Sequence, residues 1–241
     1  MNLVIYKTKD FVAYNKPAGM LVHRTHETKE GQGERTLADI ALEEFPEIKK
    51  VGDDPELRPG IVHRLDRYTS GVIIIARNQK FFEFMKGLFQ THQVTKTYCA
   101  LVNGRLMGKG VIDTPIGLKP GTVKRSVFAK NMKMVKEAIT EYAVSKMYQK
   151  EGFGGRAIYY SLVDVTPKTG RTHQIRVHLA SIGHSVVGDA LYGQKTNPLG
   201  LTRQFLHAES IEFSTPDGNR VKLEAELPKE LRDVLEALEK K

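Results

Sequence analysis

A carboxylate stands between two guanidinium groups in the segment His63-Arg64-Leu65-Asp66-Arg67. Positively charged neighbours keep a carboxylate ionised and oriented, which is what a nucleophile or a general base requires. If the strand that ends at 61–62 continues, Arg64 and Asp66 share one face and Leu65 points into the core, because side chains alternate along a strand. A surface ion pair on a loop is the alternative interpretation of this segment taken alone.

A second polar segment, Gly-Arg-Thr-His-Gln-Ile-Arg-Val-His-Leu, occupies residues 170–179. We expect Thr172 to cap a helix that ends before Gly183. The apolar face of this helix is expected to carry Ile175, Leu179 and Ile182. Free backbone N–H groups at its start, beside Arg171, would suit a phosphate. A helix with its basic residues in solvent is the alternative.

A third candidate is Tyr98, in the predicted strand that contains Lys-Thr-Tyr at 96–98. A tyrosine in a strand is ordinarily part of the core or of the sheet surface. Its functional alternative is a ring that stacks on a bound base.

Several other chemistries are excluded by residue type and spacing. The sequence has neither a glycine-rich loop ending in Gly-Lys-Ser/Thr nor a Gly-x-Ser-x-Gly turn. His173 and His178 would lie about 140° apart around a helix axis, so they do not form a helical zinc pair. Cys99 is the single cysteine, which excludes an internal disulfide and a multi-cysteine metal site. Metal and serine-nucleophile sites are therefore not expected.

The elements that must position these groups are mainly strands. Apolar runs predict a hairpin at 3–15, strands at 72–75, 95–102, 141–147 and 159–165, and a second hairpin joining 205–213 to 220–227. Helices are predicted at 37–45, capped by Thr36, and at 81–89. Short connections between many strands favour an α+β fold with a mainly antiparallel sheet over a doubly wound parallel one. No linker divides the chain, so we expect one domain over 1–241.

The charge points to a polyanionic partner. The 241 residues include 37 Lys and Arg against 28 Asp and Glu, a formal net charge of +9. Residues 114–136 hold basic side chains and no acidic one. A basic stretch can neutralise the phosphates of a nucleic acid, and a solvated basic loop is its alternative.

The sequence also predicts a cytoplasmic protein. The apolar stretch at 72–76 is far shorter than the ~20 residues that cross a bilayer. The start of the chain, Met-Asn-Leu-Val-Ile-Tyr-Lys, lacks the features of a secretory signal. We therefore expect no membrane association.

Taken together and in order, the motifs resemble the RluA-like family of pseudouridine synthases, from about residue 14 to about residue 228. The resemblance rests on Asn-Lys-Pro-Ala-Gly at 15–19, His-Arg-Leu-Asp at 63–66 with Thr-Ser-Gly at 69–71, Lys-Thr-Tyr at 96–98, the segment 170–179, Gly-Asp-x-Leu-Tyr-Gly at 188–193 and Phe-Leu-His-Ala at 205–208. It implies an α+β pseudouridine synthase catalytic fold, with a long, mainly antiparallel sheet and flanking helices and loops. It also implies isomerisation of uridine to pseudouridine within RNA, without metal or cofactor. Some relatives carry a small RNA-binding domain in front, and we expect none here.

Residue by residue, the resemblance makes Asp66 the catalytic aspartate and places Arg64 near a flipped nucleotide. Tyr98 would pack on the target ring, as a candidate for removing the proton from carbon 5, and Arg176 would pair with Asp66. Asp66 could attack the nucleotide or stabilise a cationic sugar, and the sequence does not choose between these.

RNA, either ribosomal or transfer RNA, is the expected partner of a monomeric enzyme. The residues expected to contact it are His63, Arg67, Lys124, Arg125, Lys130, Arg171 and His173. A non-catalytic RNA-binding or RNA-folding protein on the same scaffold is the alternative. Asp66 argues against it, because a carboxylate in a phosphate-binding cleft repels the ligand of a mere binder.

Overall fold

The computed structural model describes residues 3–24, 33–122, 124–128, 130–194, 197 and 199–240. The fold divides into two compact units. Unit 1 consists of Met1–Lys96 and Ala208–Glu226, and unit 2 of Thr97–His207 and Leu227–Lys241. The chain thus leaves unit 1 after Lys96 and returns to it at Ala208. The single domain expected from the sequence stays a prediction.

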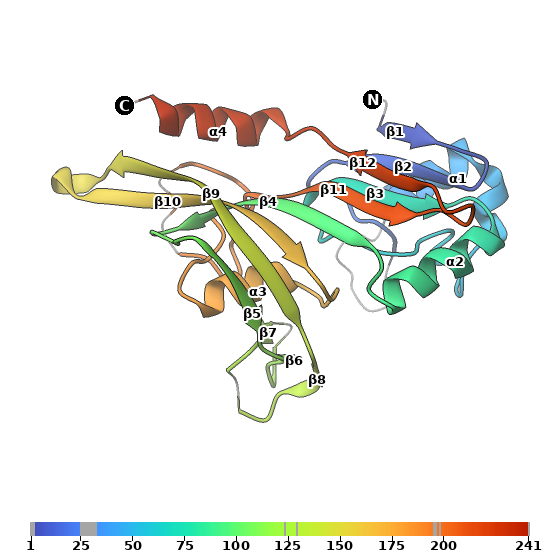
Figure 1. The fold of residues 1–241 in the computed structure, drawn as a ribbon, viewed down its shortest axis with the longest axis horizontal. Coiled ribbons are helices and arrows are strands. Elements are labelled where there is room, and N and C mark those ends of the chain that lie inside the picture. Colours follow the sequence, from blue (N-terminus) through green and yellow to red (C-terminus); the bar gives the residue numbers. More distant parts are fainter. Residues whose placement is uncertain are drawn as a thin grey trace. The chain divides into compact units, whose positions relative to one another are not determined.

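Unit 1 is a sheet with helices. Its strands are β1 (Val4–Lys7), β2 (Phe11–Lys16), β3 (Ser70–Ala76), β11 (Leu206–Ser214, from Ala208 onward) and β12 (Arg220–Glu224). Their order is β1-β2-β3-β11, and β12 pairs with β11 (Figure 1). The pairs β1–β2, β2–β3 and β11–β12 are antiparallel, so both predicted hairpins are confirmed. Every residue of β3 is buried, as its uninterrupted apolar sequence predicts for a central strand.

The two predicted helices of unit 1 are also confirmed. Helix α1 (Leu37–Glu44) begins with a capping box between Thr36 and Asp39, and a short 3₁₀ turn (Pro46–Lys50) follows it. Helix α2 (Gln79–Gln90) is capped by Asn78, whose side-chain oxygen accepts the N–H of Phe81 at 2.9 Å. Phe11 of β2 stacks on Phe81 with ring centroids 5.0 Å apart, which fixes α2 against the sheet.

Unit 2 contains two sheets and two helices. The larger sheet has the order β4 (Thr95–Asn103), β10 (Ala157–Pro167), β9 (Ile139–Glu151) and β5 (Lys109–Asp113), with all pairs antiparallel. The smaller has the order β7 (Arg125–Ser126), β6 (Ile116–Leu118) and β8 (Lys133–Lys136). The remaining elements are α3 (Gln174–Ser181), α4 (Lys229–Glu239) and the 3₁₀ turn Phe153–Gly155. The strands predicted at 95–102, 141–147 and 159–165 are confirmed.

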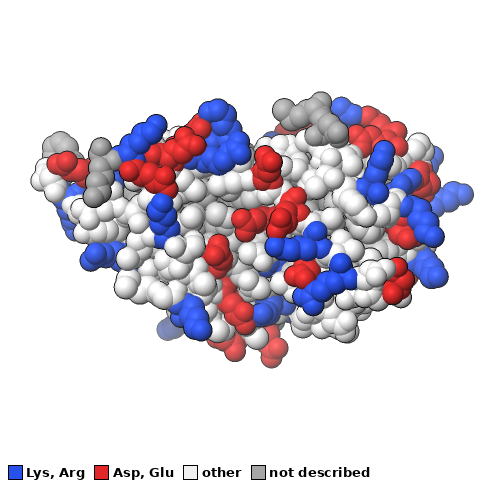
Figure 2. All heavy atoms as spheres, turned by 45° about the horizontal axis from the view of Figure 1, so that its top comes forward, with Lys and Arg blue, Asp and Glu red and all other residues white. Residues whose placement is uncertain are grey.

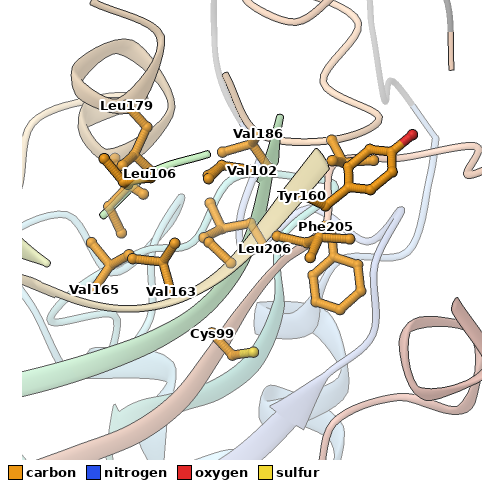
Figure 3. Close-up of a cluster of buried hydrophobic side chains, with 14 of the residues drawn as sticks. Cys99, Val102, Leu106, Tyr160, Val163, Val165, Leu179, Val186, Phe205 and Leu206 are labelled. Carbon is orange, nitrogen blue, oxygen red and sulfur yellow. The ribbon is translucent and has the colours of Figure 1, made fainter. Parts of the chain in front are cut away.

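The core of unit 2 lies between its large sheet and both helices. Figure 3 shows Val102, Val163 and Val165 of the sheet near Leu179 of α3. Leu231 and Leu238 of α4 belong to the same buried cluster. A core of this size holds β4 and α3, the two elements that carry Tyr98 and Arg176.

The expected fold class, α+β with mainly antiparallel strands, is confirmed: every strand pairing whose register is described is antiparallel. None of the helices in the described part of the chain has the length and apolar character that a bilayer crossing needs.

Candidate active site

The segment that carries Asp66 is a loop, so the prediction that a strand continues through it is wrong. Ile61 makes one isolated antiparallel bridge to Ile75, and residues 62–69 form no strand. The physical reason lies in the next backbone donor of β3. The N–H of Ile74 donates to Nε2 of His63 at 2.9 Å, so a side chain takes the place of the next ladder bond. A turn follows, in which the N–H of Thr69 donates to the carbonyl of Asp66 at 3.0 Å.

His63 anchors this loop. Because its Nε2 accepts a hydrogen bond from a backbone N–H, the ring is neutral and Nδ1 carries its hydrogen. Burial, with a smaller contribution from the charge of Lys96, lowers the pKa of His63 to about 3. The ring also packs against Phe89, with centroids 5.0 Å apart. These contacts give His63 a structural role, and its expected RNA contact stays a prediction.

A buried lysine fixes the other end of the loop. The Lys16 ammonium donates to the carbonyls of Pro17 (2.8 Å), Met20 (3.0 Å) and Arg67 (3.0 Å). The N–H of Gly19 donates to the same Arg67 carbonyl at 2.9 Å. The Asn-Lys-Pro-Ala-Gly turn and the residue after Asp66 are therefore parts of one hydrogen-bonded structure.

The exit of the loop depends on a glycine. Gly71 has φ +121°, and a Cβ built on it would lie 2.1 Å from the carbonyl oxygen of Ala208 on β11. Only a residue without a side chain allows both the backbone conformation and the approach of the two strands.

The predicted residues of this loop differ in how far they are exposed. Leu65 is buried, as expected, while Arg64 is exposed and Asp66 is half-buried. Arg67 forms an ion pair with Glu34 at 3.0 Å. Asp66 is thus carried by a loop fixed at both ends, with the exposed Arg64 near it in sequence.

In unit 2, Arg176 is held by a carboxylate that sequence reasoning left without a role. Its Nε donates to Oδ2 of Asp189 at 2.6 Å and its Nη2 donates to Oδ1 at 2.9 Å, and both residues are buried. Oδ1 also accepts the N–H groups of Leu191 (2.9 Å) and Tyr192 (3.0 Å). Burial alone would raise the pKa of Asp189, but the hydrogen bonds and charge of Arg176 hold it below its ordinary value. An aspartate whose side chain can accept the backbone N–H groups two and three residues later is the local signal that could have indicated this turn. The expected pairing of Arg176 with Asp66 stays a prediction.

The start of α3 differs from expectation. Its N-cap is His173, with a left-handed φ of +58°, and not Thr172. The side chain of His173 makes no capping hydrogen bond, and Oε1 of Gln174 instead accepts from two groups that precede the helix, Oγ1 of Thr169 (2.7 Å) and the N–H of Arg171 (3.0 Å). That amide is therefore already occupied within the protein. Ile175 and Leu179 of the expected apolar face are buried in the core of unit 2, but Ile182 is 37% exposed. Residues 174–179 are all buried, so burial extends beyond that face.

Tyr192 brings several of the predicted RNA-binding residues together. Its hydroxyl accepts the N–H of Arg125 at 2.9 Å and lies 2.9 Å from Nδ1 of His173. Lys124 donates from Nζ to the carbonyl of Leu191 at 3.3 Å. The guanidinium of Arg176 lies 5.2 Å from the centre of the tyrosine ring. The basic segment is thus attached to the turn that holds Arg176.

The other predicted residues of unit 2 are Tyr98, Lys130 and Arg171. Lys130 is exposed beyond β7, and Arg171 donates from Nε to the carbonyl of Glu137 at 2.8 Å. Tyr98 lies opposite Val165 of β10 and packs half-buried against the core of unit 2. The basic segment itself, residues 114–136, contains the small sheet β7-β6-β8, where a solvated loop is the alternative interpretation of its sequence.

The family model described as RNA pseudouridylate synthase matches residues 10–181. An uncharacterised RNA pseudouridine synthase of Chloroflexus aurantiacus is 40% identical over 93% of this chain and 66% of its own length. The tRNA pseudouridine synthase C of Haemophilus influenzae is 36% identical over 88% of this chain and 87% of its own length. The ribosomal large subunit pseudouridine synthase D of Nitrosomonas europaea is 34% identical over 98% and 64%.

Among solved structures, human RNA Pseudouridylate Synthase Domain Containing 1 has the same fold, with a TM-score of 0.72 and 24% identity over 99% of this chain and 94% of that one. The chain spans about two thirds of the length of the Chloroflexus relative and 57% of that of an Aquifex aeolicus relative. The family match includes the loop of Asp66, the strand of Tyr98 and the helix of Arg176. The chain belongs to the RNA pseudouridylate synthase family.

Proposed function

We propose that this protein isomerises uridine to pseudouridine within RNA, with Asp66 as the catalytic carboxylate. The observation that carries the proposal is the construction of the Asp66 loop. Buried Lys16 holds one end, His63 replaces a ladder bond at the other, and Gly71 sets the exit. Membership of the family supports the same reaction. A loop fixed in this way keeps a reacting group in place without help from the ligand.

The reaction rearranges one nucleotide without adding or removing atoms. The bond from the sugar to N1 of uracil breaks, the ring turns, a new bond forms from the same sugar carbon to carbon 5, carbon 5 loses its proton and N1 gains one. An ionised Asp66 can attack the nucleotide or stabilise the cationic sugar. We propose that Tyr98 packs on the uracil ring and that the Arg176 guanidinium pairs with the Asp66 carboxylate. The uridine must first leave the base stack, at a cost of a few kcal/mol.

Contacts with the RNA backbone would offset that cost. Arg64, Lys124 and Lys130 are suited to phosphates, because they are exposed and positively charged. The names of two relatives specify transfer RNA and large-subunit ribosomal RNA. We therefore propose structured RNA of one of these two kinds as the substrate. The family match draws residues from both units, which supports residues 1–241 acting as one catalytic domain. A cytoplasmic monomer stays a prediction.

The deciding experiment replaces the carboxylate and keeps its shape. We expect Asp66→Asn to abolish pseudouridine formation and to leave RNA affinity largely unchanged, because the amide cannot carry the charge that the chemistry needs. The substrate is RNA from cells lacking this protein, with pseudouridines mapped before and after incubation. Asp53→Asn is the matched control, since Asp53 is 57% exposed in an ion pair with Lys86 on the surface. Turnover by Asp66→Asn within tenfold of the parent would show that Asp66 is not the catalytic carboxylate.

The same mapping tests the alternative of a non-catalytic RNA-binding protein. If the parent binds the RNA and forms no pseudouridine in it, the chain is a binder on a synthase scaffold. The position modified by the parent would in turn identify the RNA.

A further inference from the structure

One aromatic side chain stands in solvent on the basic segment of unit 2. Phe128 is 76% exposed, which is the largest value among the exposed large hydrophobic residues of the described part of the chain. The other phenylalanines whose exposure the structure describes are buried or half-buried. A single surface apolar residue is common, so the surroundings must decide whether this ring binds anything.

The backbone beneath this ring is held in place. The N–H of Phe128 donates to Oγ of Ser126 at 3.1 Å. Ser126 pairs with Gly117 in the small sheet, and the preceding Arg125 donates its N–H to the Tyr192 hydroxyl. The ring is therefore presented to solvent by an anchored strand end.

The chemistry around the ring suits a nucleic acid strand. Lys124 and Lys130, on either side of Phe128 in sequence, are exposed. Met134 (66% exposed) and Val135 (49%) on β8 add apolar surface to the same small sheet. Residues 114–136 contain no acidic side chain. Ammonium groups bind phosphates while a planar apolar ring stacks on a base, whichever base it is.

We propose that Phe128 is a stacking platform for an unpaired base of the RNA substrate, with Lys124 and Lys130 contacting phosphates of the same strand. The proposal rests on the proposed function, since that function makes RNA the ligand. The stacked base is not the reacting uridine, because Tyr98 is the residue assigned to the target ring. Phe128 thus adds affinity for single-stranded RNA.

The chain contains no tryptophan, which provides a direct test. In Phe128→Trp the introduced indole is the only one, and its emission should be quenched when oligouridylate is added, because a stacked base quenches an indole. Met107→Trp is the matched control: Met107 is 66% exposed and lies outside the basic segment. We expect the emission of the control to change little over the same titration. Anisotropy of labelled oligouridylate reports binding independently in both variants.

A second pair of variants separates stacking from charge. Phe128→Ala should weaken binding by roughly 5- to 150-fold, the range for loss of one base–aromatic stack, with an unchanged dependence on salt. Phe128→Tyr keeps a ring and should bind like the parent. Unquenched emission from Phe128→Trp bound to RNA, or an alanine variant that binds as tightly as the parent, would overturn the proposal. Both readouts measure binding alone, so a failure to form pseudouridine would count against the proposed function and not against the platform.

Discussion

At the scale of single residues, polar groups fix the positions of the reactive ones. Lys16 is fully buried, and its ammonium donates hydrogen bonds to three backbone carbonyls. The ammonium of a surface lysine would donate to water instead. Asp189 satisfies the buried Arg176 and two amides at once. Such groups are costly to bury and are stable only when every donor finds a partner. Their loss should therefore affect the geometry of the site as well as stability.

The titration of His63 gives a prediction about acid stability. Its pKa is about 3 in the folded protein and about 6.5 when unfolded. Between these values the unfolded chain binds a proton at this position that the folded chain does not. The contribution of His63 to the free energy of unfolding is therefore fully present above about pH 6.5 and is lost as the pH falls toward 3. This one group accounts for at most about 1.4 kcal/mol per pH unit.

Chemical denaturation at several pH values between 7 and 4 measures this slope. His63→Gln keeps an acceptor for the Ile74 amide without a titrating group, so we expect a flatter profile for the variant. Burial also lowers the pKa of His23 and of His178, but both histidines remain in the variant, and the difference isolates His63. Parallel profiles for parent and variant would contradict the prediction.

At the scale of elements, periodicity and capping predicted what local sequence determines. Helix α1 follows from Thr36, α2 follows from apolar residues at helical spacing, and β3 follows from its continuous apolar run. The failures have non-local causes. The strand through 62–66 is absent because a side chain, His63, bonds the Ile74 amide. Helix α3 begins at the left-handed His173 without a capping bond from that side chain, and β6-β7-β8 forms by pairing segments separated by turns.

The same limit applies to the site. The candidate residues Asp66, Tyr98 and Arg176 are predicted from sequence motifs. The partner of Arg176 was not found, because Asp189 lies 13 residues away and its role appears only once the turn at 189–192 closes. No periodic pattern encodes a contact of that kind.

Gly71 connects the Asp66 loop to the sheet, and its substitution should damage both. We expect Gly71→Ala to lower the free energy of unfolding by about 2–4 kcal/mol, because a Cβ both strains the backbone and meets the Ala208 carbonyl. Gly87→Ala is the matched control. Gly87 lies inside α2, and the position that a Cβ would take there has nothing within 4 Å, so alanine should stabilise the helix by up to ~1 kcal/mol. Denaturant titration of both variants checks the contrast, and equal stabilities would refute the role given to Gly71.

At the scale of the whole molecule, the excess of positive charge does not make the surface uniformly positive. Figure 2 shows acidic and basic side chains interleaved over the face that it draws. A net charge of +9 can therefore attract RNA from a distance without defining where it docks. Docking must come from local groups of cations free of acids, and residues 114–136 are such a group.

The dependence of RNA binding on salt tests that inference. Replacing Lys124, Arg125 and Lys130 by alanine should weaken binding to all sequences alike, because phosphate contacts position the RNA without reading its bases. Removing one cation that neutralises a phosphate of single-stranded RNA should reduce the slope of log affinity against log salt by roughly 0.7, or about 2 for all three. The backbone bond from Arg125 to the Tyr192 hydroxyl survives these substitutions, so the small sheet should remain folded.

A control variant with the same change in net charge separates location from total charge. Lys49, Lys50 and Lys80 are exposed residues of unit 1, outside the basic segment. If the basic segment docks the RNA, the first triple variant lowers the salt slope much more than alanine at these three positions does. Equal slopes in the two variants would mean that net charge alone draws the RNA in. An unchanged slope in the first variant would remove the basic segment from the RNA site. A reduced slope with normal turnover at saturating RNA would assign these three residues to docking and leave the chemistry to Asp66.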